Sequence, residues 1–191
     1  CNVGGGVDFG HNALRDWLAG WIEEVTGRRA PTEEYVTAWD RPKMPAETDP
    51  ETGLPKIEHA RLDVSFIDGT GRRAYVDVAV TSAGTTRAAE RAKRAETDGA
   101  AADDMVRTKR SRYPPHKNPG CSLVPFVVEA LGRLSPDAED LLRALAPVDK
   151  QTRSVVLRRA KQSLSVVIQA RLADLLLSAE RSRGAAAPAA A

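Results

Sequence analysis

Two adjoining segments of alternating residues, 61–67 and 72–81, constrain the fold more than any other part of the chain. Both are rich in β-branched and aromatic residues with a period of two, which is typical of strands with one buried face. The turn between them, Asp68-Gly69-Thr70-Gly71, carries two glycines and predicts a short β-hairpin. We therefore expect an antiparallel pair of strands in the core of the fold.

The register of this hairpin brings two acidic residues together. If Asp68 faces Arg72 around the turn, Asp63 lies opposite Asp77. Directly opposed residues have Cβ atoms roughly 4.5 to 5.5 Å apart, so two like charges there repel unless a cation offsets them. Mg²⁺ is commonly held by one or two carboxylates, and we expect Mg²⁺ or Mn²⁺ at this pair. The structural alternative is a frayed or solvent-facing aspartate, and a slip of one residue would place the two side chains on opposite faces.

Composition limits the class of protein. A chain of 191 residues that is 42% hydrophobic is long enough for one compact domain. The net charge is only +2, from 28 Lys and Arg against 26 Asp and Glu, so any surface for nucleic acid must be local. Two cysteines are too few for a disulfide framework and are typical of a reducing, intracellular compartment. The longest apolar stretches contain proline or charged residues, so no membrane span is expected.

The remaining pattern predicts a mixed α/β layer structure. It adds, in order, a helix over 12–26, a short strand over 33–39, a long loop over 41–55, one or two polar helices within 86–112, a strand over 122–128, a helix over 135–146 and a long amphipathic helix over 150–181. We expect the long helix to pack its Val and Leu stripe on the domain. Residues 1–10 read as a linker from an upstream region, 11–182 as one domain and 183–191 as a disordered, low-complexity tail.

A cluster of basic residues follows the hairpin. Several cations close to one aromatic residue are typical of a surface that contacts phosphates, although the same spacing also fits the solvated face of a polar helix. The residues that we expect to contact nucleic acid are Arg107, Arg110, Arg112, Tyr113 and Lys117.

The order of these motifs resembles a known family, the restriction-like endonuclease domain of non-LTR retrotransposons, which belongs to the PD-(D/E)xK nuclease class. The resemblance is carried by Arg61-Leu62-Asp63, Tyr75-Val76-Asp77-Val78-Ala79-Val80, Lys109-Arg110-Ser111-Arg112-Tyr113 and the segment 123–133. It covers roughly 10–145, including Gly10-His11-Asn12, and continues more loosely into the long helix. It implies a mixed sheet flanked by helices and a magnesium-dependent DNA endonuclease that nicks its target for target-primed reverse transcription. The implied partners are DNA and the upstream reverse transcriptase and zinc-finger region of the same polyprotein.

The resemblance assigns roles to individual residues. Asp63 matches the first metal-binding Asp and Asp77 the second acidic position, with the carbonyl of Val78 as a third metal ligand. Lys109 matches the lysine that in this branch lies on the following helix, and Lys93 is the other lysine that we consider for that role.

Two departures from the family pattern leave an alternative open. Leu62 stands where the family has proline, and Ala79 stands where ordinary restriction enzymes carry the strand lysine. A catalytically degenerate nucleic-acid-binding or scaffold domain of the same fold is therefore the second interpretation.

Three further acidic residues are accessory candidates. Glu33 or Glu34 would add an acid to the site, although acids at the start of a strand are more often solvated. Glu129 would line the cleft or, equally, cap the next turn. Cys1 and His11 suggest the zinc segment that lies upstream in the family, but a complete four-coordinate zinc site cannot be built from them, and we expect none here.

Overall fold

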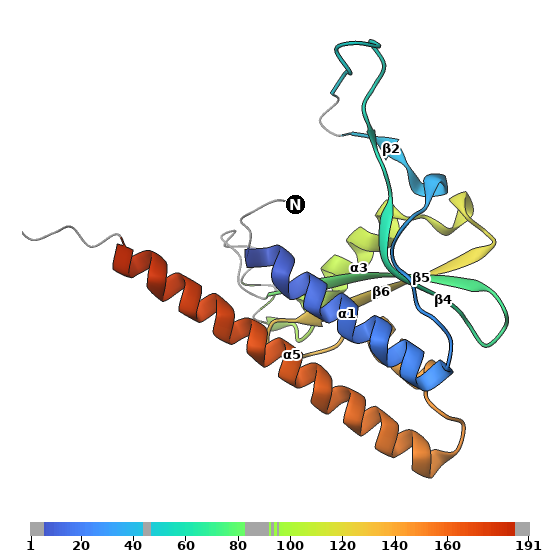
Figure 1. Ribbon diagram of the computed structural model, residues 1–191, viewed down its shortest axis with the longest axis vertical. Helices are drawn as coiled ribbons and strands as arrows, with labels where there is room; N and C mark the ends of the chain where they lie inside the picture. Colours follow the sequence, from blue (N-terminus) through green and yellow to red (C-terminus); the bar gives the residue numbers. More distant parts are fainter. Residues whose placement is uncertain (1–5, 44–46, 83–91, 93, 95, 186–191) are drawn as a thin grey trace, which may run out of the picture.

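The computed structural model describes residues 6–43, 47–82, 92, 94 and 96–185 (Figure 1). Its elements are α1 (Gly6–Thr26), β1 (Thr32–Tyr35), η1 (Thr37–Trp39), β2 (Arg41–Pro42), β3 (Ile57–Glu58), β4 (Arg61–Ile67), β5 (Arg73–Thr81), α3 (Ala100–Arg112), η2 (Pro115–Lys117), β6 (Cys121–Glu129), α4 (Pro136–Leu145) and α5 (Lys150–Ala185). The expected mixed α/β architecture is confirmed.

The main sheet has four strands in the order β1-β4-β5-β6. The β1–β4 and β4–β5 pairs are antiparallel, whereas β5 and β6 are parallel. A parallel pair requires a crossover connection, and α3 lies in that connection. The segment expected to be one long loop instead contains β2, which pairs with β3, and a bridge between Thr48 and Pro55, so part of it forms an arm that projects from the body (Figure 1).

The predicted hairpin register is confirmed over the four residue pairs nearest the turn, from Ile67 with Arg73 to Val64 with Val76. The Asp68 N–H donates to the Arg72 carbonyl at 2.9 Å, and Gly71 has a φ of 82°, which favours glycine. Glycine in the turn therefore sets the register that carries Asp63 and Asp77 toward the same end of the hairpin.

One face of the sheet carries the main hydrophobic core. The α1 side chains Leu14, Leu18 and Ile22 pack with the even-numbered residues of β5, among them Val76 and Val78. Helices α4 and α5 complete this layer. Each large side chain fully buried here contributes roughly 1.5 to 3 kcal/mol, so α1 is held firmly against the strands.

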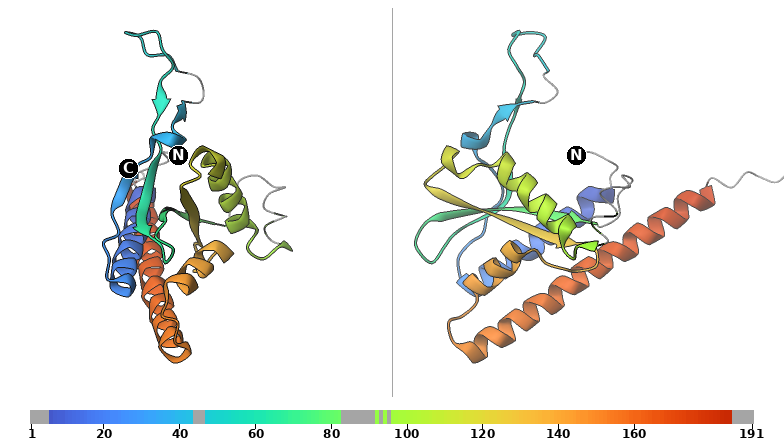
Figure 2. Two further views of the ribbon diagram at one scale, coloured as in Figure 1. Left: turned by 90° about the vertical axis from the view of Figure 1, so that its right-hand side faces the viewer. Right: turned by 180° about the vertical axis from the view of Figure 1, so that it is seen from behind.

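The other face is covered by α3 (Figure 2). The contact is made by small residues: Ala102 and Val106 of α3 pack on Ala79 of β5 and Val127 of β6. Helices α1 and α3 thus lie on opposite faces of the sheet and share β5, and a side chain from each can reach the place where β4 and β5 separate.

The long C-terminal helix is confirmed, but it packs along only part of its length. Ala160, Leu164 and Ile168 are buried in the main core. Val155 and Leu176 of the same predicted stripe are 49% and 67% exposed, so the expected packing on the domain is confirmed for the middle of the stripe and not for these two positions. Figure 1 shows α5 running well beyond the sheet. A search of the described helices finds none long and apolar enough to cross a membrane.

Candidate active site

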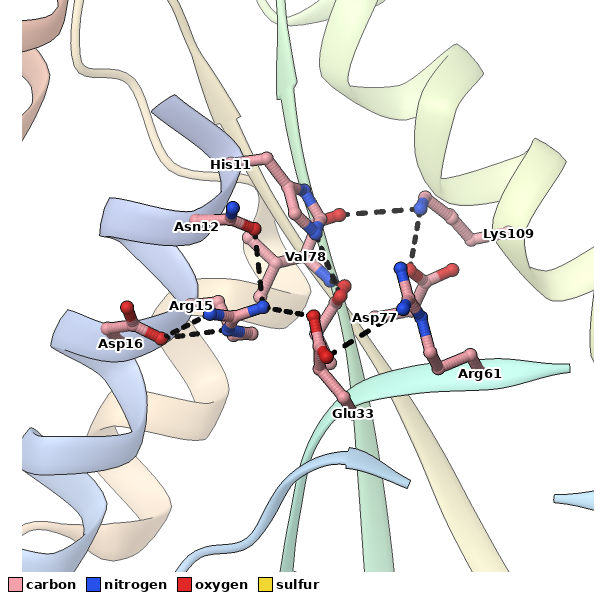
Figure 3. A network of polar contacts seen from close by, with 10 residues as sticks. His11, Asn12, Arg15, Asp16, Glu33, Arg61, Asp77, Val78 and Lys109 are labelled. Carbon is pink, nitrogen blue, oxygen red and sulfur yellow. Dashed lines mark hydrogen bonds and ion pairs between the residues drawn. The ribbon is translucent and has the colours of Figure 1, made fainter. Parts of the chain in front are cut away.

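The candidate site lies where β4 and β5 part, between α1 and α3 (Figure 3). Asp77 and Val78 belong to β5, Asp63 to β4 and Lys109 to α3, so the two strands of the hairpin and a helix distant in sequence meet around the backbone of Val78. A fifth residue, His11, reaches the site from a fourth element, α1. The sheet and its two covering helices therefore position every polar group of the site.

Asp63 is fixed by hydrogen bonds to both of its carboxylate oxygens. Oδ2 accepts the backbone N–H of Val78 at 2.6 Å, and Oδ1 contacts Nε2 of His11 at 2.8 Å. The paired register of β4 and β5 ends at Val64 and Val76, so the carboxylate satisfies an N–H that would otherwise need a partner from the neighbouring strand. The Asp63 side chain is only 13% exposed, and both bonds restrict its rotation.

Asp77 is more deeply buried, with 6% of its side chain exposed. Its Oδ1 accepts a hydrogen bond from the Lys109 ammonium at 2.7 Å, and the same ammonium lies 3.4 Å from the Val78 carbonyl oxygen. Among the described residues, Oδ2 of Asp77 has no hydrogen-bond partner. A buried carboxylate oxygen without a partner is costly, and it indicates a site that a further group completes.

The two carboxyl groups influence one another. Burial raises the pKa of Asp77 to about 6; the charge and hydrogen bond of Lys109 oppose this rise, and the nearby Asp63 adds to it. Burial also acts to raise the pKa of Asp63, but His11, the Val78 N–H and Asp77 together lower it below its ordinary value. Two adjacent acids with pKa values displaced in opposite directions are typical of a pair that shares a proton or a cation.

The donor set suits a hard divalent cation. Two carboxylates and the Val78 carbonyl offer oxygen ligands, which Mg²⁺ and Mn²⁺ prefer, and one of those oxygens is buried and unpartnered. In the part of the chain that the structure describes, no group of three or more His, Cys, Asp or Glu residues is arranged to hold a metal ion. The donors available are the two aspartates and the carbonyl, and these fit the predicted ion.

The accessory acids contact other partners. Glu34 accepts a hydrogen bond from Ser65 at 2.5 Å and pairs with Arg73 at 2.6 Å. Glu129 accepts the Ala102 N–H in the first turn of α3 at 3.2 Å, so its side chain contacts the start of an earlier helix, which differs from the expected cap of the turn that follows it. Lys93 lies outside the described residues.

Glu33 forms ion pairs with Arg15 and Arg61, which tie β1 to α1 and β4. It has a φ of 58°, and no other non-glycine residue within the described ranges has a positive φ. This strained backbone and its two arginine partners give Glu33 a structural role beside the site.

The basic segment is divided between surface and core. Arg107 and Arg110 lie on α3 with 68% and 60% of their side chains exposed, each paired with an acid, Asp104 and Asp137 respectively. Lys117 is also exposed. These residues are placed where phosphate contacts are possible.

The expected role of Tyr113 requires a correction. Tyr113 is buried, with its ring 5.5 Å from that of Trp39, so it is not available to stack on a base. The Arg112 guanidinium lies 5.3 Å from the Tyr113 ring and pairs with Glu58 at 2.5 Å. Packing of its ring against Trp39 separates Tyr113 from the surface, whereas the contact with nucleic acid expected for Arg112, whose side chain is 34% exposed, stays a prediction.

His11 is the site residue that sequence reasoning missed. It was considered only for zinc, together with Cys1, which lies outside the described residues. A single histidine near the start of a helix gives no local signal, because its partner Asp63 is 52 residues away. The helical period places residue 11 on the same face of α1 as the buried Leu14 and Leu18. This is the one sequence signal that indicates that His11 is directed toward the sheet.

Comparison with models of known protein families gave no match, and comparison with curated proteins found no significantly similar sequence.

Proposed function

We propose that this chain is a metal-dependent DNA endonuclease domain of the PD-(D/E)xK class, similar to the restriction-like endonucleases of non-LTR retrotransposons. One observation carries the proposal: Asp63, Asp77 and Lys109 come from three elements and converge on the backbone of Val78. One buried acid, a second acid and an ammonium that are both largely buried, on and beside the central strands of the sheet, supply the parts that metal-assisted phosphodiester hydrolysis requires. A structural ion pair alone would not need a second buried carboxylate.

In this proposal Asp63, Asp77 and the Val78 carbonyl hold the divalent cation. When bound, that cation polarises the scissile phosphate and lowers the pKa of a water molecule. Asp63 keeps a fixed direction through His11 and the Val78 N–H, and Asp77 offers its unpartnered Oδ2. The pKa of Asp77, raised to about 6, leaves this carboxyl mostly ionised at neutral pH and so able to bind a cation.

We assign Lys109 one role in the site without a cation and another role in the site with a cation bound. In the structure its ammonium contacts the same groups that we assign to the cation, Asp77 and the Val78 carbonyl, and it offsets the repulsion between the two acids. With those oxygens engaged in holding a cation, the Lys109 ammonium would be free to contact the scissile phosphate and stabilise its added negative charge. Exposed Arg107 and Arg110 on the same helix would contact neighbouring phosphates.

By the same resemblance, the proposed product is a nicked strand whose 3′ hydroxyl primes reverse transcription. The proposed partners are therefore DNA and, within a longer polyprotein, an upstream reverse transcriptase with its zinc-finger region. This role would place the protein inside the cell, and in a eukaryote inside the nucleus, where its target DNA lies.

The test is nicking of supercoiled plasmid by the purified chain in Mg²⁺, in Mn²⁺ and in EDTA. We expect open-circular product with either ion and none in EDTA. Cleavage that continues unchanged in EDTA would contradict the proposal, because the aspartates would then have no cation to hold. Adding Asp63→Asn as a parallel sample separates this chain's activity from that of a contaminating nuclease.

A second candidate, a non-catalytic DNA-binding domain of the same fold, is favoured by the buried pair of Lys109 and Asp77, which satisfies both charges without a metal. Its signature is salt-dependent DNA binding with no nicking under any divalent ion. Binding measured at several salt concentrations beside the nicking assay distinguishes the two.

A further inference from the structure

Asp63 is held from two directions by groups on different elements. The Val78 N–H donates to Oδ2 at 2.6 Å from the neighbouring strand, and His11 contacts Oδ1 at 2.8 Å from α1. His11 is one-third exposed, whereas Asp63 is largely buried. The imidazole, which Figure 3 shows near Val78, is thus more exposed to solvent than the acid that it contacts.

The direction of a ligating carboxylate decides how well it binds a cation. Hydrogen bonds from outer groups fix such a carboxylate, and removing them typically weakens metal affinity about 10- to 100-fold. The Val78 N–H is one such bond, but it leaves Asp63 free to turn about the axis through that single contact. The bond to His11 removes this remaining freedom.

We infer that His11 is a positioning residue, which orients Asp63 by donating its Nε2–H to Oδ1 and so raises the affinity of the site for a divalent cation. The inference rests on the proposed function for the existence of the cation site. His11 acts through Asp63, since its Nε2 is directed at that carboxylate. The neutral tautomer with the proton on Nε2 is sufficient for this role.

The chain contains a matched control. Asp40 accepts the Ala60 N–H at 2.8 Å on one oxygen and contacts Nδ1 of His59 at 2.8 Å on the other. This repeats the arrangement around Asp63, but His59 is 63% exposed and the pair is not part of the Asp77 and Lys109 site. Any general effect of breaking a histidine–aspartate contact is therefore measured by His59→Ala.

The test is the affinity of the full chain for Mn²⁺ alone, read from the free Mn²⁺ signal in electron paramagnetic resonance. His11→Ala should weaken binding about 10- to 100-fold relative to the parent chain. His11→Gln, whose side-chain amide can donate from a position close to Nε2, should restore most of that affinity. His59→Ala should bind as the parent does. In the nicking assay, raising Mn²⁺ should recover the rate of His11→Ala, because the variant is impaired in binding the cation.

The outcomes separate the inference from the proposed function. If Asp63→Ala abolishes Mn²⁺ binding but His11→Ala binds as tightly as the parent, the inference is overturned and the proposed function stands. If the parent binds no Mn²⁺, both are overturned. If His11→Gln is as weak as His11→Ala, the hydrogen bond is not the cause and the inference fails. Melting curves in EDTA verify that each variant is folded. If His11→Ala is unstable, the Mn²⁺ affinities of His11→Leu and His11→Gln are compared instead, at a temperature below the melting temperature of both variants.

Discussion

Two aspartates of one hairpin, Asp68 in the turn and Asp77 in β5, show how differently the same side chain can be used. Oδ1 of Asp68 accepts from the backbone N–H groups of Thr70 and Arg72 and from the Thr70 hydroxyl, at 2.7 to 3.0 Å. The hydroxyl of Thr70 and the N–H of Arg72 lower the pKa of this exposed carboxyl. Asp77 has one charged partner, an unpartnered oxygen and a pKa raised to about 6, chiefly by burial.

The difference separates structural acids from candidate functional acids. A carboxylate whose bonds are supplied by adjacent residues stabilises its own turn, and nothing further is needed. A buried carboxylate with a raised pKa and a free oxygen costs folding energy, and such residues concentrate at functional sites. The comparison therefore gives Asp68 a role in the turn, and it agrees with the role that we propose for Asp77 in the site.

The largest expected effect tests this assignment directly. Asp63→Asn and Asp77→Asn should each abolish metal-dependent nicking, because an amide removes the negative charge that holds the cation. DNA binding, measured by fluorescence anisotropy, should persist, since negative charge is lost from a surface that approaches phosphate. Asp68→Asn is the matched control and should nick normally. Full activity in all three variants would place the cleavage chemistry elsewhere.

The partner of Asp77 should have the next largest effect. Lys109→Ala should lower the nicking rate by about 10²- to 10³-fold, as expected for loss of one positioned charge-stabilising donor. It should also weaken DNA binding modestly and reduce the slope of affinity against salt by about one. Lys43→Ala, which breaks the exposed pair with Glu47, is the control. An unchanged rate for Lys109→Ala would show that this ammonium takes no part in cleavage and would remove Lys109 from the proposed site.

Folding stability measured against pH sharpens the contrast. The pKa of Asp77 rises from 3.8 to about 6 on folding. At a pH between these two values, the native protein therefore keeps a proton on Asp77 that the unfolded chain has lost. The stability gained is fully present below about pH 4 and lost as pH rises through about 6. Asp77→Asn does not titrate, so its free energy of unfolding in EDTA should gain about 1 to 3 kcal/mol on the parent between pH 4 and pH 7. Parallel stability curves for the two proteins would contradict the raised pKa.

Asp68 should show the smallest effect, with the opposite sign. Its pKa is lowered on folding, so its contribution is present above about pH 4 and lost as pH falls through the folded value. Asp68→Asn should therefore melt slightly below the parent at pH 7, and the difference should close in acid. Denaturation of both proteins at pH 3 and pH 7 measures this. A difference in melting temperature that widens in acid would mean that the ionised carboxylate of Asp68 does not stabilise the turn.

Local chemistry made the hairpin predictable. The glycine turn and the two-residue period fixed the pairing from Val64 to Ile67, and with it the direction of both aspartates. The separation of β4 from β5 was not predictable, because it depends on the Asp63 side chain replacing a strand partner of Val78.

Contacts between distant elements were beyond sequence reasoning. Burial of Tyr113 depends on Trp39, and the reach of His11 depends on how α1 lies on the sheet. The long helix was predicted from its period, but the period does not say where the body of the domain ends. Leu164 is therefore buried and Leu176 exposed, although both lie on one continuous helix.

The small side chains that pack between α3 and the sheet limit which residues can stand beside Asp77. Ala79 is the position at which ordinary restriction enzymes carry their lysine, and here it is buried under Ala102 and Val106. A long side chain at residue 79 would push the helix away, and Lys109 with it. Under the proposed function, a lysine carried on β5 at residue 79 would therefore not fit beneath α3 as it lies here, and Lys109 of that helix supplies the cation beside Asp77 instead.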